Sequence, residues 1–263
     1  MVEAPNMPAS AAGAAALGNG IAVASGKGGV GKTWLSITLC HALAKRGCKV
    51  LLFDGDLGLA NVDIQLGLAP SRDLGGVLAG RYGLGDAALG YSEGGFDVVA
   101  GRSGSGSLAS LPGDRLARLT AGLAQLAPAY DWLVLDLGAG VERTVRQFAA
   151  QARTCLVVTT DEPTAMTDAY AFIKLSLHRK PPPDLRLVVN MAASHGEGER
   201  TYATVRKACE SFLKIAPPLA GIVRRDGKVK EAIRNQAPLL VRYPNSAAAA
   251  DIEGLARRLV ETL

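Results

Sequence analysis

Two lysines, a threonine and four glycines stand close together in GKGGVGKT, residues 26–33. The spacing fits G-x-x-x-x-G-K-[ST], with Gly26, Gly31, Lys32 and Thr33 at the fixed positions. Glycines let successive backbone N–H groups turn into one hollow, and such a hollow at a helix N-terminus attracts phosphate oxygens. Lys32 would reach the outer phosphates of a nucleoside triphosphate, and the Thr33 hydroxyl would bind Mg²⁺. The residues expected to bind the nucleotide through this loop are Gly26, Lys27, Gly28, Gly29, Val30, Gly31, Lys32, Thr33 and Trp34.

Carboxylates follow directly after two apolar runs. LLFDGD (51–56) ends in Asp54 and Asp56, and LVLDLGAG (133–140) contains Asp136. Because the carboxyl ends of parallel strands face the ligand crevice of such a sheet, these side chains are expected beside the phosphates. Asp56 is placed to orient a water for attack on the γ-phosphate, and Asp136 to hold Mg²⁺ through water. The expected metal site therefore comprises Thr33, Asp54 and Asp136.

The elements that must position these residues alternate along the chain. The apolar runs are continuous rather than alternating, which is typical of strands covered on both faces. We therefore expect an α/β fold, a single P-loop NTPase domain with a doubly wound, mostly parallel sheet and helices on both faces. Strands are expected at 21–25, 49–54, 96–101, 132–138, 154–160, 185–190 and 219–223. Helices are expected at 32–46, 113–127, 142–152, 164–179, 198–213, 228–236 and 247–262.

Composition sets the remaining bounds. The Ala- and Gly-rich residues 1–20 predict a disordered tail, and 21–263 the folded domain. Lysine and arginine number 29 against 24 acidic residues, a formal charge of +5 that permits an anionic partner without requiring one. The four cysteines form no C-x-x-C pair, which favours free thiols in a reducing cytoplasm over a disulfide or zinc site. No window reaches the roughly 18 apolar residues of a membrane span.

Lys27, the additional lysine inside the glycine run, carries a resemblance. KGGVGKT resembles the deviant Walker A motif of the MinD/ParA family of P-loop ATPases, and the likeness extends over residues 21 to about 260. In that family the additional lysine reaches across an ATP-sandwiched dimer to the nucleotide of the partner subunit. The resemblance therefore implies ATP and Mg²⁺ as ligands, a homodimer formed with ATP, and Lys27, Lys32 and Asp56 as catalytic residues.

The same resemblance assigns further positions. Asn190, which closes LRLVVN, falls at the family's base-reading position, with a turn-capping asparagine as the alternative. Asp226 in GIVRRD matches the loop on the other side of the base, where the family often has proline at the position of Arg224. Residues 51–68 resemble the first switch region of MinD-like ATPases. Asn61 and Asp63 fall in this region and are candidates for the dimer contact; a helix-start cap is the alternative for Asp63.

Longer phrases point to one branch of the family. DGDLGLANVDIQLGL, VVTTDEPTAMTDAYAFIK and AIRNQAPLLVRYP resemble flagellar-number regulators of the FlhG/FleN (YlxH) type. That likeness implies a cytoplasmic ATPase that limits the number or sets the placement of flagella. Its usual partners are the FlhF-type GTPase, flagellar C-ring components and transcriptional regulators. The N-terminal residues lack the DQAxxLR-like segment with which many members stimulate that GTPase.

Other surfaces leave alternatives open. The stripe of Ile252, Leu255 and Leu259 lies on a stretch of net negative charge, which favours packing on the sheet over docking to anionic lipid. Membrane recruitment is therefore expected to be weak or to need a partner. A ParA-type DNA-partitioning ATPase would use the same catalytic residues, and a nucleotide-gated binding module with negligible turnover is the other alternative. The candidate DNA patch is Arg224, Arg225, Lys228, Lys230 and Arg234.

Overall fold

The computed structural model describes residues 17–56, 58, 60–101, 111–179 and 182–263. The first strand, β1 (Leu17–Ser25), begins four residues before the expected start of the domain. Leu17 is fully buried, and the side-chain amide of Asn19 donates to the carbonyl oxygens of Ala127 (3.0 Å) and Tyr130 (2.8 Å). The predicted boundary after residue 20 was therefore wrong, because residues 17–20 extend the central strand. The rest of the expected tail, residues 1–16, lies outside the described residues.

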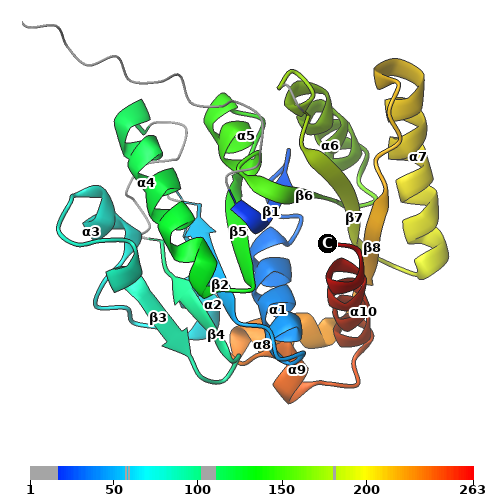
Figure 1. The fold of residues 1–263 in the computed structure, drawn as a ribbon. Coiled ribbons are helices and arrows are strands. Elements are labelled where there is room, and N and C mark those ends of the chain that lie inside the picture. Colours follow the sequence, from blue (N-terminus) through cyan, green and yellow to red (C-terminus); the bar gives the residue numbers. More distant parts are fainter. Residues whose placement is uncertain (1–16, 57, 59, 102–110, 180–181) are drawn as a thin grey trace, which may run out of the picture.

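The described strands form one eight-stranded sheet in the order β3-β4-β2-β5-β1-β6-β7-β8 (Figure 1). Every neighbouring pair is parallel except β3–β4, so the expected mostly parallel sheet is confirmed. The sequence did not predict β3, a short strand that pairs antiparallel at the sheet edge. Besides β1, the strands are β2 (Val50–Gly55), β3 (Ala88–Tyr91), β4 (Phe96–Val99), β5 (Trp132–Ala139), β6 (Ala152–Thr159), β7 (Asp184–Ala192) and β8 (Leu219–Arg224).

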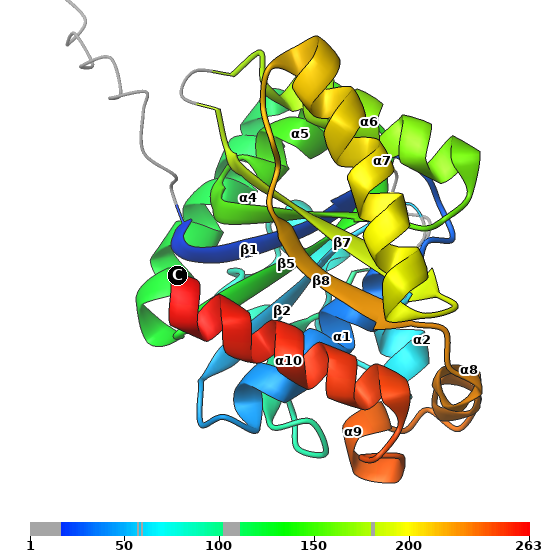
Figure 2. The same cartoon turned by 90° about the vertical axis from the view of Figure 1, so that its right-hand side faces the viewer.

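Helices cover both faces of the sheet (Figures 1 and 2). One layer contains α1 and α10, and the other contains α4, α5, α6 and α7. The short helices α2, α3 and α9 were not predicted. The α-helices are α1 (Lys32–Ala44), α2 (Val62–Leu66), α3 (Leu74–Leu78), α4 (Gly113–Leu126), α5 (Arg143–Ala149), α6 (Pro163–Ser176), α7 (His195–Leu213), α8 (Gly227–Arg234), α9 (Leu239–Arg242) and α10 (Ala247–Thr262).

The alternation of side chains along β1 explains why residues 21–24 are all apolar. Ile21 and Val23 point into the core beneath α1 and α10, whereas Ala22 and Ala24 point into the core beneath α4–α7. All four are fully buried. The part of the strand that faces two cores has no solvent side on which to place polar residues, so polar side chains stand only toward its two ends, at Asn19 and Ser25.

The C-terminal helix α10 packs on the sheet, as its apolar stripe predicted. Ile252, Leu255 and Leu259 are buried in the core shared with α1, and α10 lies along β8 (Figure 2). Its apolar face is therefore already covered within the chain. Among the residues that the structure describes, no helix combines the length and the apolar character needed to cross a bilayer.

Candidate functional site

A pocket of about 470 Å³ opens at the carboxyl ends of the strands. It brings together segments that lie about two hundred residues apart along the chain, at the strand ends where the carboxylates were expected. A larger cavity of about 1030 Å³, between α4 and α5, holds none of the predicted site residues. The pocket is lined by Gly28, Gly29, Gly31, Lys32, Thr33, Trp34, Asp56, Asn61, Gln65, Ala139, Asn190, Met191, Arg224, Arg225, Asp226, Val229, Lys230 and Ile233.

The glycine-rich loop between β1 and α1 has a backbone that side chains would block. A Cβ on Gly26 would lie 2.3 Å from the carbonyl oxygen of Asp168. Gly31 has φ of +87°, and a Cβ there would lie 2.5 Å from Nδ2 of Asn190. These glycines therefore permit both the turn and the close approach of α6 and β7. Of the predicted loop residues, Gly26, Lys27 and Val30 do not line the pocket.

Lys32 begins α1 and is almost entirely buried. Its Nζ donates to Oγ of Ser25 at 2.9 Å, and that hydroxyl donates in turn to the carbonyl oxygen of Lys27 at 2.6 Å. Burial lowers the pKa of Lys32, and the carboxylates of Asp136 and Asp56 oppose that change. The ammonium group is thus bound to Ser25, at the end of β1, and interacts electrostatically with two carboxylates.

Asp136 supplies a carboxylate oxygen that the described residues leave unbonded. The side chain is fully buried; Oδ1 accepts from the Ser36 hydroxyl at 3.0 Å, whereas Oδ2 has no hydrogen-bond partner among the described residues. Burial raises the pKa of Asp136 to about 6, against the hydroxyl of Thr33, the charge of Lys32 and the hydroxyl of Ser36, which act to lower it. Buried carboxylates are normally paired or ligate a metal, so the free oxygen is a candidate metal contact.

The donor set fits Mg²⁺ held partly by phosphates. Thr33 and Asp136 offer hard oxygen atoms, which this ion prefers. In the described part of the chain, no three His, Cys, Asp or Glu side chains gather closely enough to hold a metal by themselves. A magnesium ion here would therefore complete its octahedron with water and substrate oxygens, as is usual when one or two carboxylates bind it.

Asp54 and Asp56, at the carboxyl end of β2, differ in their contacts and in their position relative to the pocket. Asp54 is fully buried, and its two oxygens accept from the backbone N–H groups of Asp56 (3.2 Å) and Val62 (3.3 Å). Burial, reinforced by Asp136, raises the pKa of Asp54 to about 7. Asp54 thus holds the loop that leads into α2 and does not line the pocket. Asp56 does line it, close to the backbone of Gly138.

The first switch also contains Asn61 and Asp63. Asn61 precedes α2 and lines the pocket. Asp63 lies in the first turn, where its Oδ1 accepts from the backbone N–H of Ile64 at 2.8 Å. Asp63 is therefore not the N-cap residue of α2, a position that Asn61 occupies.

Asn190 connects the end of β7 to the glycine loop. Its side chain is buried, and Nδ2 donates to the carbonyl oxygen of Val30 at 2.8 Å. This hydrogen bond uses one N–H of the amide, so the acceptor Oδ1 and the second N–H are left for a ligand. Asn190 thus contacts the loop rather than capping a local turn, and it lines the pocket as predicted.

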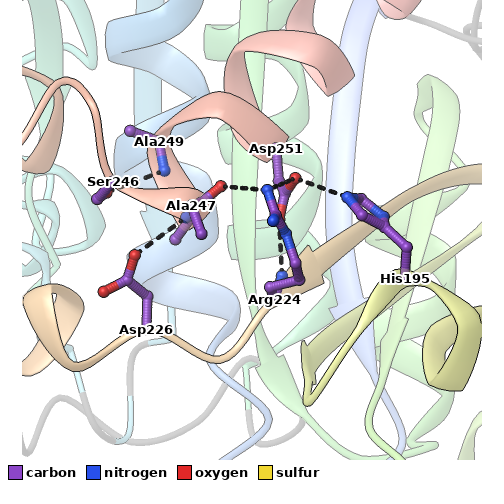
Figure 3. Close-up of polar contacts among 8 residues, drawn as sticks. His195, Arg224, Asp226, Ser246, Ala247, Ala249 and Asp251 are labelled. Atoms are coloured by element: carbon purple, nitrogen blue, oxygen red, sulfur yellow. Dashed lines mark hydrogen bonds and ion pairs between the residues drawn. The ribbon is translucent and has the colours of Figure 1, made fainter.

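Asp226 lines the pocket and also caps two helices. Its Oδ1 accepts from the backbone N–H of Lys228 (2.9 Å) at the start of α8. Its Oδ2 accepts from the backbone N–H of Ala248 (3.2 Å) at the start of α10. Figure 3 shows Asp226 beside the first turn of α10. This double cap fixes the loop after β8, so the structure gives Asp226 a clear role in shaping the pocket wall.

Comparison with known proteins decides the family. The model of the CobQ/CobB/MinD/ParA nucleotide binding domain matches residues 21–239. The chain belongs to this family. The match begins in β1 and includes the glycine loop, both carboxylate strands, Asn190 and Asp226.

Individual CobQ/CobB/MinD/ParA relatives cover most of the chain. The antiactivator FleN of Pseudomonas aeruginosa is 39% identical over 239 residues, which are 91% of this chain and 85% of FleN. The flagellum site-determining protein YlxH of Helicobacter pylori is 32% identical over 92% of this chain and 82% of YlxH. The septum site-determining protein MinD of Pyrococcus horikoshii, solved with Mg-ADP, superposes with a TM-score of 0.74 at 23% identity, covering 92% and 95% of the two chains.

The additional lysine of this MinD/ParA-family chain lies outside its own pocket. Nζ of Lys27 is paired with the carboxylate of Glu162 and donates to Oγ1 of Thr164 at 2.8 Å. Both partners stand at the start of α6. Within one chain, Lys27 therefore contacts α6 and not the predicted phosphate site.

Several polar residues at the site were not predicted from the sequence as site residues. Ser25 holds Lys32, Ser36 holds Asp136, and Gln65 and Arg225 line the pocket. A signal existed for Ser36, because it stands one helical turn after Lys32 on the same face of α1. Gln65 and Arg225 carried none, since their place in the pocket depends on how α2 and the loop after β8 fold over the strand ends.

Proposed function

We propose that this chain is an ATPase whose ATP-bound copies pair face to face, and that it regulates the number or placement of flagella. One arrangement carries the proposal. Lys32, Thr33, Asp56 and Asn190 line one pocket, and Asp136, whose Oδ2 has no partner among the described residues, interacts with Lys32 and Thr33. Binding a triphosphate needs cations and metal ligands, and hydrolysing it needs a carboxylate that orients water. Recognising the base needs a polar side chain that can form hydrogen bonds with it.

The chain's own residues would divide the reaction as follows. The glycine-loop N–H groups and Lys32 bind the β- and γ-phosphates, and Oδ1 of Asn190 accepts from the exocyclic amine of adenine. Thr33 and Asp136 hold Mg²⁺, which when bound neutralises phosphate charge. Asp56 orients the attacking water; its carboxylate lies near Gly138, at the carboxyl end of β5. Asp54 positions Asp56 by holding its backbone N–H.

Lys27 gives the proposal its second part. This side chain does not line its own pocket, and it would complete the site of a second copy once it leaves Glu162 and Thr164. If Lys27 of each chain completed the site of the other, two chains would enclose two ATP molecules, and hydrolysis would let the chains separate. A partner-binding surface that forms only on the dimer would then last until the γ-phosphate is hydrolysed.

The flagellar assignment is supported by the relatives. FleN is named an antiactivator and YlxH a flagellum site-determining protein, and both align along most of this chain. We accordingly propose a cytoplasmic protein whose partners are an FlhF-type GTPase, a C-ring component or a transcriptional regulator. Since the apolar face of α10 is covered, contact with the cell membrane would be made through a partner.

The alternative function, DNA partitioning, is less well supported, because part of the candidate DNA patch is paired with acidic side chains. Arg224 is paired with Asp251, and Lys228 with Glu231. Two of the five cations that the DNA alternative needs are thus neutralised within the chain. Nonspecific DNA binding usually rests on several unpaired lysines and arginines that contact phosphates.

Phosphate release by wild type and Asp56→Ala tests the proposal. We expect the variant to bind ATP with unchanged affinity and to hydrolyse it at least about a hundredfold more slowly, since it cannot orient the water. The matched control is Asp114→Asn, an exposed aspartate on α4 outside the pocket lining. A wild type that turns over no faster than Asp56→Ala would leave a nucleotide-gated binding module in place of an ATPase.

A further inference from the structure

A buried carboxylate on α10 is connected to the wall of the nucleotide pocket. The side chain of Asp251 is only 5% exposed. Its Oδ2 accepts from the backbone N–H and from Nε of Arg224, both at 2.9 Å, and Oδ1 accepts from Nη2 of Arg224 at 2.9 Å. Oδ1 also lies 3.2 Å from Nε2 of His195 (Figure 3). A buried charge with this many partners fixes the group it contacts.

Asp251 engages two adjacent nitrogens of the Arg224 guanidinium, Nε and Nη2. A guanidinium group has five N–H donors. Nε and one hydrogen of Nη2 serve Asp251, and Nη2 also lies 3.3 Å from the carbonyl oxygen of Ala247. The remaining donors both belong to Nη1. Arg224 therefore has no free pair of N–H groups on adjacent nitrogens, which is what a two-point contact to a ligand requires.

Arg224 stands at the end of the pocket away from the catalytic carboxylates. It closes β8, at one edge of the sheet, whereas Asp56 follows β2, five strands away in the sheet order. Asn190, at the end of neighbouring β7, lines the pocket between them. Under the proposed function this is the nucleobase end of the pocket.

Guanine and adenine differ in the hydrogen bonds that they could form with an unpaired arginine side chain. Guanine presents two adjacent acceptors, O6 and N7, which a guanidinium contacts in a two-point fashion, and each good contact of this kind discriminates strongly between bases. Adenine presents a donor at N6 in place of O6, so it gains less from the same group. An arginine whose adjacent donors are already engaged still offers a base its flat face, on which either purine can stack, and the donors of Nη1, but not the two-point contact.

We propose that Asp251 is a specificity-positioning residue for the nucleobase: by engaging the adjacent donors of Arg224, it withholds the contact that would select guanine and leaves adenine as the preferred base. This inference rests on the proposed nucleotide function. Asp251 does not touch the base; it acts through Arg224. Arg225 also lines the pocket, and its contribution is common to every variant below.

The test is the ratio of dissociation constants for the imido analogues of GTP and ATP, measured by calorimetry with Mg²⁺. Asp251→Ala frees Arg224 and should move the ratio toward GTP by about tenfold. The double variant Arg224→Ala/Asp251→Ala should return to the wild-type ratio. His195→Ala is the matched control: it removes a different partner of Asp251 and should leave the ratio unchanged.

Thermal melts establish that each variant is folded at the assay temperature. If Asp251→Ala is not, Asp251→Asn takes its place, because the amide keeps the size and one acceptor oxygen while losing the charge; a shift of about threefold is then expected. A folded Asp251 variant that binds the ATP analogue with an unchanged ratio overturns the inference alone. A wild type that binds neither analogue overturns the proposed function instead. A shift that persists in the double variant assigns it to another residue and also overturns the inference.

Discussion

Lys27 is held within its own chain by Glu162, the residue immediately before α6. The ammonium group pairs with the Glu162 carboxylate and also donates to Thr164 at 2.8 Å. The side chains are 35% and 61% exposed, so the pair is worth little, at most about 1 kcal/mol. If Lys27 completes the site of a second copy, this contact must break first, and the pair therefore opposes dimerisation weakly.

Glu162→Gln should make ATP-dependent dimerisation easier. The amide cannot pair with the Lys27 charge, so the protein concentration at half-dimerisation should fall by about two- to fivefold, in keeping with the value of an exposed pair. Sedimentation velocity at saturating ATP measures it. Asp161→Asn, one residue earlier and without a described contact to Lys27, is the control. A half-dimerisation concentration that rises in Glu162→Gln would mean that Glu162 assists pairing.

Gly31→Ala and Gly29→Ala separate backbone strain from a steric clash. Both glycines have positive φ, +87° and +80°, so either alanine costs about 1–2 kcal/mol of stability. Only at Gly31 would the new methyl group meet Asn190, whose Nδ2 is 2.5 Å from the Cβ position; nothing lies within 4 Å at Gly29. We expect Gly31→Ala to weaken ATP binding at least tenfold more than Gly29→Ala, measured by calorimetry. Equal losses would show that Asn190 does not matter to the loop.

Asp136→Asn should stabilise the nucleotide-free protein above pH 6. An unfolded aspartate has a pKa near 3.9, whereas burial raises that of Asp136 to about 6. Between these values the folded state binds more protons than the unfolded state, so Asp136 makes stability fall as pH rises from about 4 to about 6. The amide removes that penalty and the repulsion of Asp54.

At pH 8 the gain from Asp136→Asn should be about 1–2 kcal/mol, or roughly 2–8 °C in Tm for a chain of this size. The exposed Asp114→Asn should change stability by less than about 0.5 kcal/mol. Melts from pH 4 to pH 8 make the comparison. A variant less stable than wild type at pH 8 would show that the Asp136 carboxylate is not a cost to the empty fold.

The sequence predicted the parts of the site that repeat a local rule. The glycine loop needs only its own spacing, and Asp56 and Asp136 stand where buried strands end, so their residue types and positions sufficed. Asn190 was assigned by the resemblance to the MinD/ParA family. The start of β1 was missed because Gly18, Asn19 and Gly20 carry no strand signal; their place depends on the contacts of Asn19 with residues more than a hundred positions away.

Contacts between distant segments account for the other omissions. That Glu162 would meet Lys27 depends on α6 beginning beside the glycine loop, and that Asp251 would meet Arg224 depends on α10 returning along β8. Asp54 resembled a metal ligand in sequence, yet both its oxygens hold backbone N–H groups of the following loop. Its place in a metal site stays a prediction.

The role of Lys27 between two chains is tested most directly by light scattering with ATP. Molar mass is measured for wild type, Lys27→Ala and the non-hydrolysing Asp56→Ala, with ATP affinity measured alongside. We predict that Lys27→Ala binds ATP as wild type does but stays a monomer and does not hydrolyse it, while Asp56→Ala accumulates as a dimer. An ATP-bound Lys27→Ala dimer as stable as that of Asp56→Ala would contradict the account.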